Sequence, residues 1–161
     1  EGRMSARRSS GKRTAVPRIT EMTLEACRAL LKRHHVGRMA YCLHDRVDIA
    51  PIHYVYADEW LFARTSHGHK MATLAHAPWV AFEVDEIDDV FDWHSVVVHG
   101  TVHTMEREGS PGDADHWARG IQLLREIVPE TGTTDDPVPF RELVFGIFLD
   151  TVTGRVSTTR R

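Results

Sequence analysis

The sequence predicts a mainly β protein of the α+β class, a six- to seven-stranded antiparallel β-barrel with flanking helices. Three observations carry this prediction. The chain of 161 residues has room for one hydrophobic core, its apolar segments are mostly short and separated by turns, and residues 143–152 are almost entirely apolar. A strand that is apolar on both faces is typical of a closed barrel, and a small barrel is filled by side chains. A ligand must therefore bind on its outside or between subunits.

The first half of the chain is predicted to begin with a helix and to continue as a meander of strands. Thr20 or Thr23 is placed to cap this helix, in which apolar residues recur at helical spacing as far as the basic run 32–35. From Val36 onward the period changes to that of strands. The three strands expected there are 36–43, 47–56 and 60–64. Only three residues separate the last two, which favours an antiparallel hairpin.

The second half is predicted to start with a short helix over 70–75, which Pro78 ends. Two strands follow, 79–84 and 93–105, with an acidic run between them. Gly100 inside the second strand predicts a bulge or a close approach of another backbone. The remaining elements are a second helix, which starts at Asp113 or Asp115 and ends before Pro129, and the strand 143–152.

Charge divides the chain into an arm and a body. Residues 1–13 hold five basic side chains and one acidic side chain, whereas the whole chain has a formal net charge of −3. We expect a disordered basic arm over 1–14, whose first three residues precede Met4 and resemble the remnant of an expression tag, and a single domain over 15–161. The body is strongly acidic, which fits poorly against a phosphate backbone. No nucleic-acid partner is predicted.

Three further classes of protein are not expected. No segment approaches the roughly 18 to 20 apolar residues of a membrane span, so no membrane partner is predicted. Two cysteines, without an initial signal segment, fit a reducing cytoplasm, and neither is expected to be catalytic. The eleven histidines do not predict a metal site. His67 and His69 belong to a loop, and His99 and His103 lie about 13 Å apart if they share a strand, too far to share an ion.

The segment 63–70, Ala-Arg-Thr-Ser-His-Gly-His-Lys, lies where a strand is expected to end and a helix to begin. It combines the hydroxyls of Thr65 and Ser66, N–H groups freed by Gly68, a positive helix start and the cation of Lys70. Those are the groups that bind a phosphate. Lys70 is the only lysine after residue 32 in a chain rich in arginine, and its compact charge differs from the planar fork of arginine. The alternative interpretation is an ordinary entry into a helix.

Four segments in this order resemble a known family. They are Val-Gly-Arg-Met-Ala at 36–40, Ala-Pro-Ile-His-Tyr-Val-Tyr at 50–56, Gly-His-Lys at 68–70 with Leu74 and Pro78, and Trp-His-Ser-Val-Val-Val-His-Gly at 93–100. Together they resemble the pyridoxamine 5′-phosphate oxidase-related, FMN-binding split-barrel proteins, nearest to the branch of the nitroimidazole-resistance reductases. The resemblance covers about residues 20 to 105 and extends to Thr-Gly-Arg at 153–155.

The resemblance implies a split β-barrel homodimer with FMN at the subunit interface. Carried over to this chain, segment 65–70 would hold the phosphate and ribityl end, and the main chain of 50–53 would run along the isoalloxazine. Trp93 and His94 would approach from the partner subunit. The candidate cofactor-binding residues are Ala50, Pro51, Ile52, His53, Arg64, Thr65, Ser66, His69, Lys70, Trp93 and His94. No catalytic residue and no metal ligand is assigned.

By this resemblance the protein is an FMN-dependent oxidoreductase that passes electrons from a reduced nicotinamide or similar donor to a small electron-poor acceptor. Two alternatives stay open: an F420-dependent reductase on the same fold, and a flavin- or haem-binding protein without turnover. Ala63 stands where the nitroimidazole-reductase branch usually has a histidine, so the chemistry of that branch does not transfer directly. The C-terminal substrate-phosphate residues of true pyridoxamine-phosphate oxidases have no convincing counterpart, so that oxidation is not expected.

Overall fold

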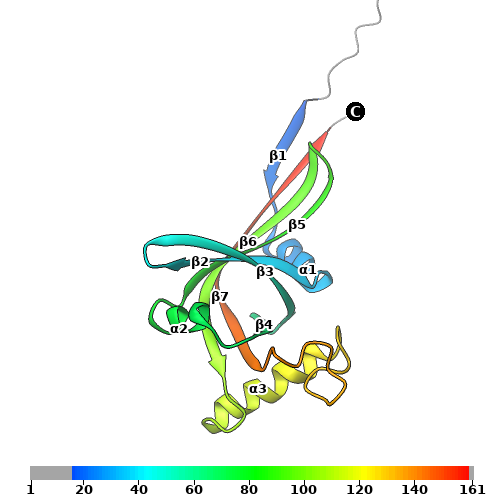
Figure 1. Cartoon of the computed structure of the whole chain (residues 1–161). Helices are drawn as coiled ribbons and strands as arrows, with labels where there is room; N and C mark the ends of the chain where they lie inside the picture. Colours follow the sequence, from blue (N-terminus) through cyan, green and yellow to red (C-terminus); the bar gives the residue numbers. More distant parts are fainter. Residues whose placement is uncertain (1–15, 160–161) are drawn as a thin grey trace, which may run out of the picture.

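Six antiparallel strands close into a barrel in the computed structural model, which describes residues 16–159 (Figure 1). The strand order is β1-β7-β4-β3-β2-β5-β6, and β6 pairs back onto β7 to close the ring. The elements in chain order are β1 (Pro17–Glu21), α1 (Leu24–Arg33), β2 (Val36–Leu43), β3 (Arg46–Ala57), β4 (Trp60–Thr65), α2 (His69–His76), β5 (Trp79–Asp89), β6 (Asp92–Met105), α3 (Pro111–Leu124) and β7 (Leu143–Thr159).

The predicted fold class is confirmed. The sheet has seven strands and the structure has three helices, with α2 inserted between β4 and β5. The basic arm predicted for residues 1–14 lies outside the described residues. No helix in the described part of the chain combines the length and the apolar character that crossing a membrane requires.

The last strand, β7, holds the barrel together because it pairs with three neighbours. It pairs with β4 over residues 143–148, with β6 over 144–157 and with β1 over 155–159. The apolar run that predicted this strand covers only its first part, and the pairing continues to Thr159. The polar remainder is a strand because two neighbours supply its hydrogen bonds.

The prediction for Gly100 is confirmed. The register between β6 and β7 shifts at His99 and Gly100, so that His99 lies opposite Thr151 and Gly100 opposite Leu149. A Cβ atom on Gly100 would clash with the backbone carbonyl oxygen of Phe148. Glycine is therefore required where the two longest strands of the barrel come closest together.

Two apolar clusters form the core. The larger fills the barrel, and its centre contains Tyr54, Phe82 and Phe145, all almost fully buried. Tyr54 contacts Phe82 edge to face, with ring centroids 5.0 Å apart, and donates a hydrogen bond to the Leu31 carbonyl oxygen (2.7 Å). This bond attaches α1 to the barrel. The smaller cluster lies beneath α3 and includes Phe62.

Three local features differ from the sequence prediction. Thr23 caps α1, because its Oγ1 accepts a hydrogen bond from the Ala26 N–H (3.2 Å), whereas Thr20 belongs to β1, a strand that was not predicted. An edge strand of five residues carries little periodic signal. Ser110 caps α3, so this helix begins before Asp113. The acidic run after Val84 forms the tip end of a long β5–β6 hairpin instead of a loop, because its residues pair with β6 as far as Asp89.

The close approach at Gly100 leads to a stability prediction. Gly100→Ala should lower the free energy of unfolding by about 1 to 3 kcal/mol, because the added methyl group overpacks the β6–β7 contact. Gly112→Ala is the matched control, since a Cβ at that position in α3 meets no atom within 4 Å. Urea denaturation followed by circular dichroism measures both. Equal midpoints for the two variants would contradict the assigned close contact.

Candidate functional site

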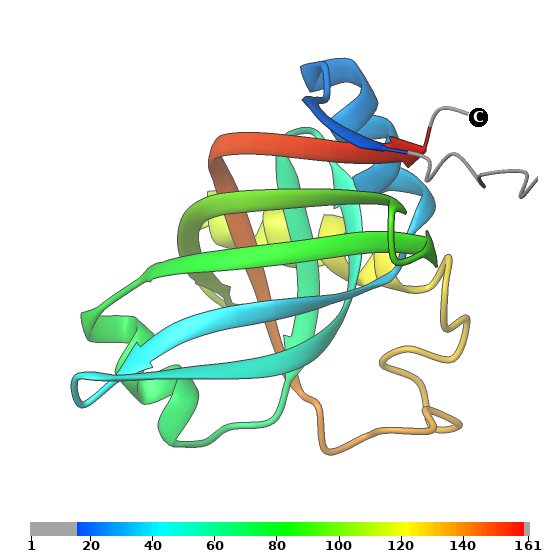
Figure 2. The ribbon, with the colours of Figure 1, turned by 90° about the horizontal axis from the view of Figure 1, so that it is seen from above.

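Two groups of predicted cofactor residues lie at opposite ends of the barrel. Residues 64–70 lie at the end of β4 and the start of α2, whereas Trp93 and His94 lie at the base of the β5–β6 turn. Figures 1 and 2 show α2 and the β2–β3 hairpin at one end of the barrel and the tip of the β5–β6 hairpin at the other. One chain therefore does not bring all the predicted residues together.

Residues 65–70, called the phosphate half below, connect β4 to α2. Gly68 precedes the first helical residue, His69, and offers no side chain to cap the helix. A Cβ atom on Gly68 would meet nothing within 4 Å, so the loop is open on this side. The uncapped N–H groups and the positive end of the helix favour an anion here.

Lys70 lies half-buried at this helix start. Its Nζ atom is 5.9 Å from the centroid of the Tyr41 ring, and the Tyr41 hydroxyl donates a hydrogen bond to Asp48 (3.0 Å). Burial and the nearby Arg141 guanidinium lower the pKa of Lys70, and the Asp48 carboxylate offsets part of this effect. Lys70 is thus a partly desolvated cation.

Arg141 is a member of this region that the sequence analysis missed. Thr65 at the end of β4 lies opposite Leu143 at the start of β7, so the chain entering β7 runs beside the chain leaving β4. Arg141 precedes Leu143 by two residues, and it lines a cavity together with Arg64 and Asp136. Neither Lys70 nor Arg141 forms an ion pair in the part of the chain that the structure describes. No local sequence signal marks Arg141, since only the pairing of distant strands brings it there.

The guanidinium of Arg64 is bound by Asp136, not directed to the phosphate half. Arg64 Nη2 donates to Asp136 Oδ1 (2.8 Å), and Nη1 donates to the other carboxylate oxygen. The two side chains are only 10% and 3% exposed. Asp136 also accepts hydrogen bonds from the N–H groups of Gly132 (2.8 Å) and Val138 (3.0 Å). The Arg64 side chain therefore holds the loop 125–142 against β4.

Beside the phosphate half, β3 presents a free edge. β3 pairs with β2 over residues 46–53 but with β4 only over residues 54–57. In the first stretch the backbone groups that point away from β2 have no strand partner in the described part of the chain. Their carbonyl groups are available to a ligand, whereas the Ile49 N–H donates to Asp48 Oδ1 (2.8 Å) and Pro51 has no N–H. The four predicted residues on it differ in exposure: Ile52 is buried, Ala50 is half-buried, and Pro51 and His53 are exposed.

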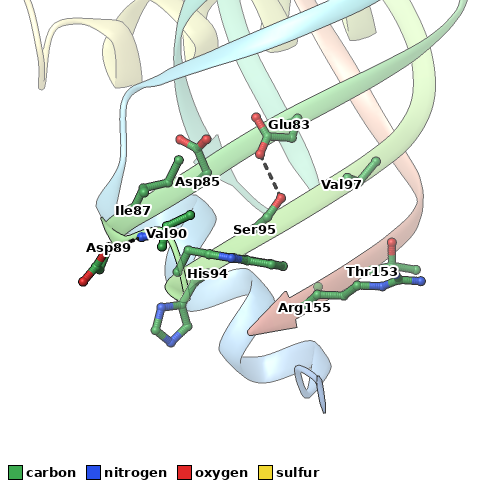
Figure 3. Close-up of a pocket in the computed structure, with 12 residues that line it drawn as sticks. Glu83, Asp85, Ile87, Asp89, Val90, His94, Ser95, Val97, Thr153 and Arg155 are labelled. Carbon is green, nitrogen blue, oxygen red and sulfur yellow. Dashed lines mark hydrogen bonds between the residues drawn. The ribbon is translucent and has the colours of Figure 1, made fainter. Parts of the chain in front are cut away.

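Trp93 and His94 line a groove of about 700 Å³ between β5, β6 and the end of β7 (Figure 3). Both side chains are half-exposed. The apolar part of the lining comes from Ile87, Val90 and Val97. This groove is large enough for an aromatic ligand, but within one chain it lies far from Lys70.

The polar lining of this groove is largely paired. Ser95 Oγ donates a hydrogen bond to Glu83 Oε1 (2.8 Å), which Figure 3 marks. Arg38 Nη1 contacts Asp85 Oδ1 (2.9 Å) and Glu83 Oε2 (3.4 Å). Arg155 borders the groove from β7. These contacts hold the Glu83 and Asp85 carboxylates in place and leave the apolar part of the lining accessible to a ligand.

The hairpin that carries Trp93 is anchored to α1 through Glu86. Arg33 Nε contacts Glu86 Oε1 at 2.6 Å, and His34 Nε2 contacts the same oxygen at 2.5 Å. The hydrogen bond from Arg33, with a smaller contribution from that of His34, lowers the pKa of Glu86 to about 2. The carboxylate is therefore charged at neutral pH, and it holds the β5–β6 hairpin against the end of α1.

A second groove, of about 640 Å³, lies between the β2–β3 turn and α2. Its lining includes His44, His69 and His76, so the predicted residue His69 borders it. No group of three or more histidine, cysteine or acidic side chains suited to a metal ion occurs within residues 16–159.

Fold and site together define a split β-barrel protein, in which β3 and β4 diverge beside a cationic helix start. A family model described as pyridoxamine 5′-phosphate oxidase matches residues 23–156, so this chain belongs to that family. The predicted family is confirmed. No curated protein matches the chain.

Solved structures of low sequence identity share the fold. A FAD-binding protein from Mesorhizobium loti has a TM-score of 0.70 and 23% identity, over 88% of this chain and 99% of that protein. A proposed 5-nitroimidazole antibiotic resistance protein from Bacteroides thetaiotaomicron has a TM-score of 0.64 and 14% identity, over 88% and 89% of the two chains. A FAD and haem binding protein from Mycobacterium smegmatis has a TM-score of 0.60 and 16% identity, over 84% and 71%.

The buried Arg64–Asp136 pair makes stability depend on pH. Bonds from Arg64, Gly132 and Val138 hold the pKa of Asp136 well below its usual range. The unfolded carboxyl titrates near pH 3.9, so this contribution is complete above about pH 5 and is lost as the pH falls through the unfolded pKa towards the folded pKa. Asp136→Asn should lower the free energy of unfolding by about 3 to 5 kcal/mol at pH 7, because Arg64 keeps a buried charge without its partner.

Urea midpoints measured from pH 7 down to pH 3 test this linkage. The wild-type midpoint should fall more steeply below pH 5 than that of Asp136→Asn, which lacks the titrating group. If the urea midpoints of the wild-type protein and of Asp136→Asn fall in parallel as the pH is lowered, Asp136 is not the group that makes stability depend on pH.

Proposed function

We propose that this protein is a flavin-dependent oxidoreductase that binds FMN in a site shared by two copies of the chain. The observation that carries the proposal is the position of Lys70, an unpaired and partly buried cation at an open helix start, beside the free edge of β3. A flavin phosphate needs cations and N–H donors, and its ring system needs hydrogen-bonding groups along one edge. The donor set of this region fits both requirements.

The residues of this chain would bind and orient the cofactor. Lys70, the hydroxyls of Thr65 and Ser66 and the first N–H groups of α2 would hold the phosphate. The unpaired N–H and C=O groups of residues 46–53 would fix the edge of the ring system. A bound flavin supplies hydride and electron transfer, which accounts for a site without a catalytic triad or a reactive cysteine. A reduced nicotinamide or similar donor and a small electron-poor acceptor are the proposed reactants.

A second copy of the chain is the proposed partner. The outward sheet face carries exposed apolar side chains, among them Val47 (80% exposed), Ile49 (63%), Trp79 (60%) and Ile87 (67%). Ile49, Ala40 and Ala81 form one cross-strand row through β3, β2 and β5. Exposed apolar side chains gathered on one face are typical of an interface, and the charged residues of the same face, Arg38, Glu83 and Asp85, are paired with one another.

A two-fold axis near the middle of this face would bring opposite ends of two barrels together. The groove with Trp93 and His94 from one copy would then lie against the phosphate half and the β3 edge of the other. This arrangement unites the two groups of predicted residues that one chain keeps apart. It also covers the exposed apolar side chains and excludes water from the flavin ring.

FAD is the second candidate cofactor. The groove between the β2–β3 turn and α2 begins at His69, next to Lys70, and its volume of about 640 Å³ offers space for a nucleotide beyond the first phosphate. Two of the proteins with this fold are described as FAD-binding. Haem binding is a third candidate, since one of them also binds haem. F420 remains the alternative predicted from the sequence. The two free cysteines support a reducing, cytoplasmic location.

Lys70→Ala tests the phosphate site. A charge-assisted hydrogen bond contributes about 1.5 to 3 kcal/mol, so the variant should bind FMN about 10- to 150-fold more weakly. Riboflavin, which lacks the phosphate, should bind with unchanged affinity. Lys70→Arg should recover part of the loss. Quenching of flavin fluorescence measures both ligands, and Lys32→Ala, an exposed lysine in the last turn of α1, is the control.

Equal losses of FMN and riboflavin affinity in Lys70→Ala would mean that Lys70 supports the fold and does not contact the phosphate. Titration of the wild-type protein with FAD, F420 and haem in the same assay ranks the other cofactors. A wild-type protein that binds none of the flavins would refute the proposed function.

Ala81→Arg tests the shared site. Ala81 lies in the central row of the apolar face, where a long charged side chain would meet its own copy across the axis. The variant should be monomeric in size-exclusion chromatography with light scattering and should bind FMN more weakly. Ala118→Arg, on the exposed side of α3, is the matched control and should stay dimeric. A monomeric Ala81→Arg with wild-type FMN affinity would rule out a site between subunits.

A further inference from the structure

The groove between the β2–β3 turn and α2 has histidines on both of its walls. One wall is a single face of α2, because its residues 69, 72, 73 and 76 recur at i, i+3, i+4 and i+7. His69 and His76 stand at the two ends of this face, roughly 10 Å apart along the helix axis. The small side chains of Ala72 and Thr73 lie between them. This wall therefore has a recess of small residues flanked by two imidazoles.

The β2–β3 turn forms the opposite wall. Its lining residues are Cys42, Leu43, His44 and Asp45. His44 and Asp45 have φ angles of 49° and 61°, which match the twist of a tight two-residue hairpin, so this wall is an ordered turn. Asp45 is the only acidic residue of the lining, and Leu43 faces the groove together with the alanines of α2. The groove therefore suits a flat and largely apolar ligand.

The histidines of this groove do not converge on one point. No three side chains of the metal-binding types meet within residues 16–159, so side chains alone do not hold a metal ion here. Haem iron needs less from the protein, because the porphyrin supplies four nitrogen ligands and the protein adds only one or two axial ligands. The volume of about 640 Å³ is that of a cofactor pocket. The groove therefore fits haem better than a free ion.

His76 has the hydrogen bond that an axial ligand needs. Its Nδ1 atom lies 3.0 Å from the carbonyl oxygen of Ala72, which can only accept a hydrogen bond. In the neutral imidazole Nδ1 therefore carries the proton, and Nε2 keeps a free electron pair for a metal. A bond of this kind also fixes the ring orientation and raises the basicity of the ligating nitrogen. Neither His44 nor His69 makes a side-chain hydrogen bond in the part of the chain that the structure describes.

We propose that this groove is a haem site and that Nε2 of His76 is the axial ligand of the iron. The porphyrin would lie between the β2–β3 turn and the face of α2, with Leu43 and Ala72 against it. The site needs neither a bound flavin nor a second copy of the chain, so it goes beyond the proposed flavin function. It gives haem a location separate from the groove with Trp93 and from the free edge of β3.

Titration with haemin, followed by visible absorption, is the direct test. The wild-type protein should shift the Soret band of free haemin, and His76→Ala should lose this shift because the iron loses its axial nitrogen. His116→Ala, which removes an exposed histidine of α3 outside the groove, is the matched control and should keep the shift. A wild-type protein that leaves the Soret band unshifted would overturn the proposal.

Iron-free protoporphyrin IX separates ligation of the iron from the shape of the groove. Its fluorescence titration should give the same affinity for the wild-type protein and for His76→Ala, since the porphyrin has no metal for His76 to bind. Loss of protoporphyrin binding in His76→Ala would mean that the imidazole only shapes the groove. His44→Ala and Cys42→Ala test the other wall and should keep the Soret shift. A shift that disappears in either of them and persists in His76→Ala would overturn the assignment.

Two variants separate this inference from the proposed function. His76→Ala should bind FMN as the wild-type protein does, and Lys70→Ala, which lies outside the lining of the groove, should keep the Soret shift. A protein that binds FMN and does not shift the haemin spectrum refutes the haem site alone. A protein that shifts the spectrum through His76 and binds no flavin refutes the proposed function and supports the haem site.

Discussion

The pairing of β7 with both β4 and β6 is the constraint on which the rest of the structure depends. This pairing closes the barrel, and it requires the register shift at Gly100, where the β6 backbone comes close to the carbonyl oxygen of Phe148. Closure fills the interior with side chains such as Tyr54 and Phe82, so no ligand can enter there. Function must therefore lie on the outer surface, where closure also determines which segments meet.

The same pairing creates the candidate site. Because β4 leaves β3 after four paired residues and continues along β7, part of the β3 edge stays free and the exit from β4 meets the entry into β7. The free edge offers backbone donors and acceptors, and the exit from β4 leads to Lys70. A polar edge and a cationic helix start thus lie beside one divergence of strands, which is the physical basis for proposing a flavin there.

Opposite ends of the barrel carry complementary halves of the proposed site. The hairpin with Trp93 is held by Glu86, Arg33 and His34, and the exit from β4 is held by Arg64 and Asp136. Both anchors are charged pairs that bridge distant segments, so each half is fixed within its own chain. A dimer across the apolar face would need only to bring two preformed halves together, with little loss of conformational entropy on association.

The sequence by itself determined the class of the fold, most strands, the bulge at Gly100 and the family, and the assignment of Lys70 to a phosphate site stays a prediction. These features follow from local causes: alternation of apolar residues, a capping threonine, and the order of short motifs along one stretch of chain. The edge strand β1 and the extension of β5 and β7 were not predictable, because polar residues become strands only when a neighbour supplies hydrogen bonds. Only the tertiary structure decided that Arg64 is bound by Asp136 and that Trp93 and His94 lie at the opposite end of the barrel from Lys70. Those decisions depend on which distant strands pair, and strand pairing leaves no mark on the residues next to it in sequence.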